Sequence, residues 1–277
     1  MPRVLLIGNH PEIGHALATS PALADCEIVT AAGNVGALHT VRSRAIDVVV
    51  TDPDTAIDDD LALVAELHGS RPGLKAIVLA PAAAPGEFIE AIRSHVFACF
   101  VAPFDMEAVG DMTRRAIDAV DWHDGICLES GLPHWISLTV SCRLLTAERL
   151  VHFMNEYRRD LADADRDSLM TAFREMLMNA MEHGAGFDPE KVVNVIAVRT
   201  ERAIVYHFRD PGTGFGSSQL AQNALSSREA DPIALIEQRA EMGLRPGGFG
   251  ILVARQLVDE MYYNERGNEV LLIKRLG

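Results

Sequence analysis

The chain has 277 residues, 48% of them hydrophobic, and a formal net charge of −14. This length suits two domains, each large enough to bury its own core. The acidic charge argues against nucleic acid as a partner, because phosphate backbones are bound by Lys and Arg. No apolar run reaches the roughly 18 residues of a membrane span, and the start of the sequence lacks the pattern of a signal peptide. The cysteines are scattered without metal-ligand spacing, as is typical of free thiols, so we expect a cytoplasmic protein that binds neither membrane nor nucleic acid.

Residues 1–120 alternate short apolar runs with amphipathic stretches. The runs are continuous and bounded by Gly, Pro or Asp, as is typical of parallel strands buried on both faces. Helical spacing of apolar residues after each run predicts a helix there, the last over about 105–120. The segment is therefore predicted to form a doubly wound, flavodoxin-like α/β domain. The predicted strands cover 3–8, 26–32, 47–52, 75–80 and 98–103.

Residues 121–134 hold Gly, Pro and polar side chains without a clear period, which indicates a linker. From residue 135 to 277, helices beside an antiparallel sheet predict a second domain, an α+β layer. Thr146 is the expected N-cap of its first helix. The predicted strands cover 135–142, 192–200, 203–210 and 269–276, the middle two as a hairpin. The predicted helices cover 146–161, 165–184 and 250–261, with a Gly-rich, weakly patterned region over 211–250.

The helix predicted over 165–184 carries three polar residues at four-residue steps: Glu175, Asn179 and His183. They flank the apolar arc of this helix rather than occupy its outermost face. An amide oxygen can coordinate Mg²⁺, and a carboxylate can accept a proton from an attacking group. The alternative is that the three side chains are solvated or cap the end of the helix.

Two glycine-rich segments follow this helix in the chain. In the first, Asp210 ends a predicted strand and Gly212 and Gly214 follow, an arrangement that suits hydrogen bonding to the amino group of a purine but also suits an ordinary turn. The second opens a predicted helix, whose free N–H groups suit a triphosphate, with a glycine-rich hinge as the alternative. Its glycines are Gly247, Gly248 and Gly250.

These segments together resemble the Bergerat-type ATP-binding domain shared by histidine kinases, gyrase B and Hsp90. The sequences "REMLMNAMEHG" and "GGFGILVARQLVDEMYYNERGNEVLLIKRL" most resemble the anti-sigma-factor serine kinase branch of that family. The resemblance covers residues 135–277 and implies an α+β ATP-binding sandwich with ATP and Mg²⁺ as ligands.

The resemblance also implies a role for each matching residue. Asn179 would be the Mg²⁺ ligand and Glu175 the general base toward a hydroxyl acceptor. Asp210 would bind the adenine amino group, in a pocket shaped by Gly212 and Gly214. The cluster Gly247, Gly248 and Gly250 would contact the phosphates, and residues 215–246 would form a mobile lid. Two further residues match less specifically: His183, which fits the helix motif or a helix end, and Arg245, which could reach the triphosphate.

The acceptor is not expected to be a histidine of this chain. A histidine kinase carries its phosphorylated His on a dimerising helical hairpin ahead of the ATP domain, whereas His123 and His134 lie in the predicted linker and His152 lies on the first helix of the domain. The resemblance implies a serine/threonine kinase that acts on an anti-sigma-factor antagonist. The alternative is a non-catalytic, nucleotide-gated module that grips a sigma factor or another signalling partner.

Residues 1–120 resemble the receiver domain of response regulators, with Asp52 at the end of the third strand as the possible phosphoacceptor. The groups that normally support phosphorylation are replaced. Gly8 and Asn9 stand where the family carries an acidic pair, Ala102 stands in place of the Lys, and Ala80 stands in place of the Thr or Ser. We therefore expect a pseudo-receiver that serves interaction or dimerisation, with a homodimer as one possible assembly. The acidic residues Asp54 and Asp58–Asp60 either replace the metal ligands or, for the run, charge a helix N-terminus.

Overall fold

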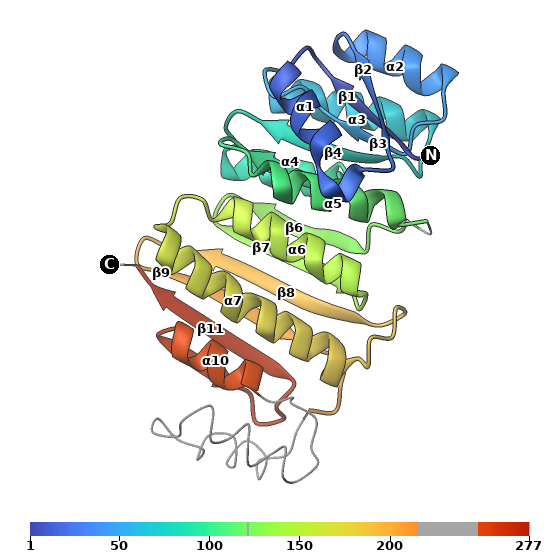
Figure 1. Ribbon diagram of the computed structural model, residues 1–277. Coiled ribbons are helices and arrows are strands. Elements are labelled where there is room, and N and C mark those ends of the chain that lie inside the picture. The colour runs from blue at the N-terminus through green and yellow to red at the C-terminus, as the bar shows by residue number, and fades with distance from the viewer. Residues whose placement is uncertain (121, 215–248, 277) are drawn as a thin grey trace. The chain divides into compact units, whose positions relative to one another are not determined.

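A computed structural model of the chain describes residues 1–120, 122–214 and 249–276 (Figure 1). The chain divides into two compact units, Met1–Cys127 and Leu128–Gly277, and each is described by itself. Within the described ranges, every helix is too short or too polar to cross a membrane.

The N-terminal unit holds a five-stranded parallel sheet with the strand order β2-β1-β3-β4-β5. This is the flavodoxin-like order, so the predicted fold class is confirmed for this unit. The strands are β1 (Arg3–Ile7), β2 (Glu27–Ala31), β3 (Val48–Val50), β4 (Lys75–Ala80) and β5 (Ala98–Val101). The helices are α1 (Pro11–Thr19), α2 (Gly33–Ser43), α3 (Ile57–Ser70), α4 (Pro85–Arg93) and α5 (Met106–Asp118), with a short 3₁₀ turn at Pro21–Leu23.

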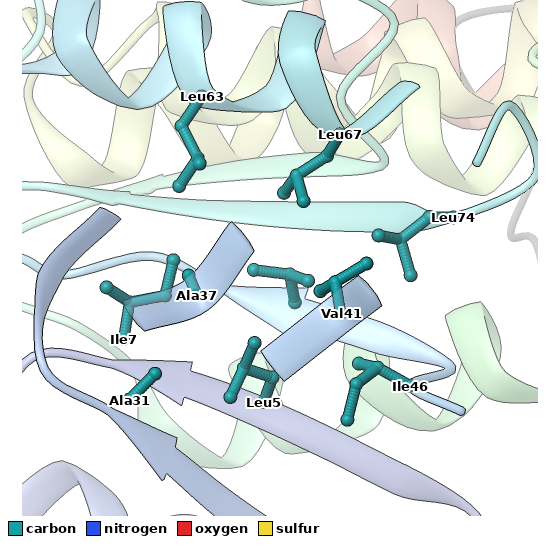
Figure 2. Packing of buried hydrophobic residues seen from close by; sticks show 10 residues of the cluster. Leu5, Ile7, Ala31, Ala37, Val41, Ile46, Leu63, Leu67 and Leu74 are labelled. Atoms are coloured by element: carbon teal, nitrogen blue, oxygen red, sulfur yellow. The ribbon is translucent and has the colours of Figure 1, made fainter. Parts of the chain in front are cut away.

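The central strands of this sheet are buried, and they consist mainly of Val, Ile, Leu and Ala. Figure 2 shows the packing on one face, where Leu63 and Leu67 of α3 and Val41 of α2 meet Leu5 and Ile7 of β1. Apolar side chains on both faces of a strand leave no solvated side, which explains the continuous apolar runs in the sequence.

The C-terminal unit holds a six-stranded sheet with the order β10-β11-β9-β8-β7-β6, in which the pairs from β10 to β7 are antiparallel. Helices α6, α7 and α10 lie side by side on one face of this sheet (Figure 1). The strands are β6 (Ile126–Leu132), β7 (Trp135–Ser141), β8 (Val192–Arg199), β9 (Ala203–Arg209), β10 (Glu260–Tyr263) and β11 (Glu269–Arg275). The helices are α6 (Leu144–Tyr157), α7 (Asp163–Asn179) and α10 (Phe249–Leu257), and α7 continues as the π-helical turn η2 (Ala180–Gly184).

Three details of the C-terminal unit differ from the sequence prediction. Strand β6 lies in the segment expected to be a linker; most of its side chains are partly or fully exposed, so it lacks an apolar run. Helix α6 begins at Leu144 with Arg143 at its N-cap, and the expected cap Thr146 is a buried residue of the first turn. The helix expected over 250–261 ends at Leu257, because Glu260–Tyr263 pair with β11 as a strand. In this last case tertiary pairing overrides the helical period.

We predict that Phe173→Ala lowers the free energy of unfolding of the C-terminal unit by about 3–5 kcal/mol. Phe173 is fully buried and packs edge-on against Tyr206 and Phe208 of β9, with ring centroids 4.8 and 5.0 Å away. Urea unfolding followed by circular dichroism measures the loss. Leu144→Ala, at a side chain that is 52% exposed, is the control and should cost less than about 1 kcal/mol. Equal losses in the two variants would contradict this account of the core.

Candidate functional site

The polar strip of α7 lies against the first turn of α10. Gly250 is so close to it that a Cβ there would overlap the Oε2 atom of Glu175 and lie 3.3 Å from the Nδ2 atom of Asn179. A Cβ at this position would displace the end of the Glu175 side chain. The N–H groups of the first turn of α10 have no partner within that helix, so the contact places hydrogen-bond donors beside a carboxylate and an amide.

The side-chain amide of Asn179 is incompletely satisfied. Its Nδ2 atom is buried and has no hydrogen-bond partner within the described part of the chain. Such a group costs about 1–3 kcal/mol unless a ligand or water satisfies it. Directly after Asn179 the α-helix changes to the π-helical turn η2, a distortion that is frequent at functional sites.

The π-helical turn η2 ends at Gly184, which lies against Asp210 at the end of β9. A Cβ on Gly184 would overlap the Asp210 carboxylate, and a Cβ on Gly212 would lie 2.8 Å from Oδ1 of Asp210. The N–H of Gly212 donates to the same Oδ1 atom at 2.7 Å. Two glycines therefore lie against the carboxylate, and the N–H of one of them donates to it. Gly184, the last residue of the quoted helix motif, was missed as a site residue.

Burial raises the pKa of the Asp210 carboxyl above its usual range, although the N–H groups of Gly212 and Asp210 and the charge of Arg266 oppose the shift. The backbone of Asp210 is fixed by Asn268: its N–H donates to the Asn268 carbonyl at 3.1 Å, and Asn268 Nδ2 donates to the Asp210 carbonyl at 3.3 Å. Gly214, at φ +76°, packs so closely on the Arg266 carbonyl that no side chain fits. The turn between β10 and β11 thus supports the Asp210 loop, a contact that the sequence analysis did not predict.

The structure therefore brings Glu175, Asn179 and Gly250 together in one group. A second group, Asp210, Gly212 and Gly214 with Gly184, is joined to the first by the turn η2. His183 lies on this turn with an exposed side chain. The remaining predicted positions, Arg245, Gly247, Gly248 and the expected lid over 215–246, lie outside the described residues.

The N-terminal unit has its own polar cluster at the ends of β1 and β3. His10 Nε2 lies 2.8 Å from Asp52 Oδ1 and 3.5 Å from Asp54 Oδ2. The backbone N–H of Asp54 also donates to Asp52 Oδ1, at 2.9 Å. Burial lowers the pKa of His10, but the hydrogen bond and charge of Asp52, together with Asp54, outweigh it and raise that pKa. The side chain of His10, which the sequence analysis did not select, is the hydrogen-bonding neighbour of Asp52, whereas Gly8 and Asn9 supply no acidic pair.

Asp60 differs from the two aspartates that precede it in the first turn of α3. Asp58 and Asp59 are exposed, as expected for charges at a helix N-terminus, whereas Asp60 is fully buried. Neither carboxylate oxygen of Asp60 has a hydrogen-bond partner in the described ranges. Burial raises its pKa to about 7; a nearby Thr51 hydroxyl opposes the shift, and the charges of Asp52 and Asp59 add to it.

Comparison with known proteins identifies the C-terminal fold. Residues 141–274 match the family model of the histidine kinase-like ATPase domain. This part of the chain is similar to the histidine kinase-like ATPase domains. An ATPase domain implies ATP as its ligand, and the predicted ATP-binding sandwich is confirmed as a fold class.

Solved structures that resemble the chain include receiver domains. They include a CheY-like receiver domain protein from Methanospirillum hungatei JF-1 (17% identity, 43% of this chain and 94% of that chain covered, TM-score 0.38). The signal receiver domain of an HD domain-containing protein from Pseudomonas fluorescens Pf-5 also matches (22% identity, 42% and 94% covered, TM-score 0.37). A third is a response regulator from Thermotoga maritima (16% identity, 43% and 98% covered, TM-score 0.38). No curated protein matches the chain.

We predict that Asp60→Asn removes a pH dependence from the stability of the N-terminal unit. With a pKa raised from 3.8 to about 7, Asp60 favours folding at low pH, and this contribution is lost as the pH rises from about 4 to 7. The loss is on the order of 1.4 kcal/mol per pH unit. The variant should therefore match the parent at pH 4 and be more stable by a few kcal/mol at pH 8.

Chemical unfolding at pH 4, 6 and 8 in the presence of EDTA measures this difference. Asp58→Asn, in the same helical turn but exposed, is the matched control and should follow the parent at every pH. Parallel stability curves for Asp60→Asn and the parent would show that Asp60 does not carry the effect.

Proposed function

We propose that the chain is a signalling regulator whose ATPase domain binds Mg²⁺-ATP and transfers a phosphoryl group to a serine or threonine of a partner protein. By the resemblance of its motifs, the partner is an anti-sigma-factor antagonist or a related regulator. The receiver-like unit would modulate this activity and could also mediate a homodimer. The observation that carries the proposal is the close approach of Gly250 to Glu175 and Asn179 of α7. The continuation of this helix, η2, places Gly184 against Asp210.

The residues present fit a magnesium nucleotide. The buried Nδ2 atom of Asn179 has no hydrogen-bond partner among the described residues and would donate to a phosphate oxygen, and the backbone of Gly184, Gly212 and Gly250 lies against the side chains of Asp210 and Glu175. A carboxylate oxygen suits the amino group of adenine. Helix N-termini suit phosphate.

Each side chain then has one task. Asp210 would accept a hydrogen bond from adenine and fix the orientation of the base. Asn179 would hold Mg²⁺, which neutralises charge on the phosphates when bound. Gly250 would allow the backbone of α10 to approach the phosphates. Glu175 would accept the proton of the attacking hydroxyl, for which its partly exposed side chain is accessible.

A protein acceptor fits this chain better than a histidine of its own. His152 lies on α6, which packs with α7 on the sheet, and His134 lies in the turn between β6 and β7. Neither belongs to a dimerising hairpin ahead of the domain. This supports transfer to a second protein.

A second candidate function is a nucleotide-gated binding module without catalysis. The pairing of His10 with Asp52 favours it, because a chain that has lost one phosphoryl-transfer centre could have lost a second. In this case the domain would bind ATP, and a sigma factor or another partner would be held or released with the nucleotide.

We predict that Asp210→Asn weakens ATP binding by at least about tenfold, because a hydrogen bond to a charged acceptor contributes about 1.5–3 kcal/mol. Isothermal titration of the full chain with ATP, with and without Mg²⁺, measures the change. Asp163→Asn, at an exposed position on α7, is the control and should bind as the parent does. An unchanged affinity in Asp210→Asn, or a parent that does not bind ATP, would refute the nucleotide site.

We predict that Glu175→Gln keeps ATP binding but lowers phosphoryl transfer about 10²–10⁴-fold, the usual contribution of a general base. Labelled ATP with purified candidate antagonist proteins measures transfer, and titration measures binding. Glu182→Gln, in the exposed part of η2, is the matched control. If Glu175→Gln leaves partner regulation intact and the parent labels no acceptor, the binding module is the correct function.

A further inference from the structure

The polar cluster of the N-terminal unit opens into a cavity. The cavity has a volume of about 410 Å³ and lies at the edge where the parallel strands end. His10, Glu12 and Asp54 line its polar side, and Ile13, Phe104 and Met106 are among its apolar walls. In doubly wound sheets this edge is where ligands bind.

Three side chains at this edge could serve one ion. One ligand atom each of His10, Asp52 and Asp54 lies within 4.8 Å of the others. His10 and Asp52 are mostly buried, with side chains 15% and 18% exposed, whereas Asp54 is 83% exposed and reaches the cluster from the solvent side. The cluster therefore has two nearly fixed ligands and one that can adjust.

The charges around the imidazole are not balanced. His10 lies within 4.0 Å of three carboxylates, those of Glu12, Asp52 and Asp54, and no Lys or Arg among the described residues forms an ion pair with any of them. The buried carboxyl group of Asp60, beside the Thr51 hydroxyl, is a further electrostatic neighbour of Asp52. A single imidazolium leaves this edge with excess negative charge, so a divalent cation would complement it.

The ligand types select the class of cation. An imidazole nitrogen with carboxylate oxygens suits Zn²⁺ and neighbouring transition metals, whereas Mg²⁺ prefers oxygen ligands only. Metal–ligand bonds of about 2.0–2.2 Å in a tetrahedron put the ligand atoms roughly 3.3–3.6 Å apart. The distance between His10 Nε2 and Asp54 Oδ2 is 3.5 Å, and the 2.8 Å distance from Nε2 to Asp52 Oδ1 would open by roughly 0.5 Å once the shared proton leaves.

We propose that His10, Asp52 and Asp54 form a binding site for a transition-metal dication such as Zn²⁺. The site differs from the magnesium site of phosphorylated receivers, because Gly8 and Asn9 stand where the acidic pair would be and an imidazole takes part instead. Three protein ligands leave a fourth position for water or for a donor group of a partner, next to the cavity. The proposal concerns the N-terminal unit and does not depend on ATP binding.

The test is Zn²⁺ binding to the EDTA-treated full chain, measured by equilibrium dialysis with metal analysis. His10→Gln and Asp54→Asn should each lose one equivalent of Zn²⁺ or bind it at least about tenfold more weakly than the parent. His15→Gln, an exposed histidine on α1, is the matched control and should keep that equivalent. Co²⁺ should give a visible absorption band in the parent and in His15→Gln but not in His10→Gln.

Because the Asp54 side chain is mostly exposed, its substitution tests the site even if a change at His10 impairs folding, which circular dichroism would report. Equal Zn²⁺ stoichiometry and affinity in the parent, His10→Gln and Asp54→Asn would overturn the proposal. It would also be overturned if equimolar Mg²⁺ displaced the bound Zn²⁺.

Discussion

The candidate nucleotide site depends on one constraint, the close contact of glycine backbone with the polar side chains around helix α7. Helix α7 presents Glu175 and Asn179 to Gly250 of α10, and its π-helical continuation brings Gly184 against Asp210. A Cβ at Gly184 would overlap the Asp210 side chain, and one at Gly250 would displace the end of Glu175. The site therefore rests on two close contacts, one just before the turn η2 and one at its end. Every role proposed for the ATPase domain requires both contacts.

Much of the fold was predictable because buried elements have a recognisable pattern of apolar residues. Strands β3 and β4 are buried on both faces and read as continuous apolar runs, and the β8–β9 hairpin shows alternation. Strands β6 and β10 were missed for the opposite reason. Their residues are largely exposed or partly exposed, so sheet pairing, which the sequence does not display, decides their structure.

The site was predictable where residues share one element and not where remote segments meet. The four-residue spacing predicted Glu175 and Asn179, because residues four apart lie on the same face of a helix. Gly184 was missed because its close approach to Asp210, not its φ, requires glycine. Asn268 and Arg266 were missed because they act through the β10–β11 turn, which fixes the Asp210 loop by backbone hydrogen bonds and a close contact at Gly214.

The carboxylates of Asp210 in the C-terminal unit and Asp52 in the N-terminal unit differ in their surroundings. Among the printed contacts of Asp210 is one N–H, that of Gly212, whereas Asp52 Oδ1 is bonded to both His10 and the Asp54 N–H, and its Oδ2 lies against Gly8. A phosphoacceptor needs an accessible oxygen and neutralisation of the incoming phosphate charge. At Asp52 the nearest basic side chain, His10, already binds the carboxylate itself. This argues that the N-terminal unit acts through what binds at its polar edge rather than through phosphorylation of Asp52.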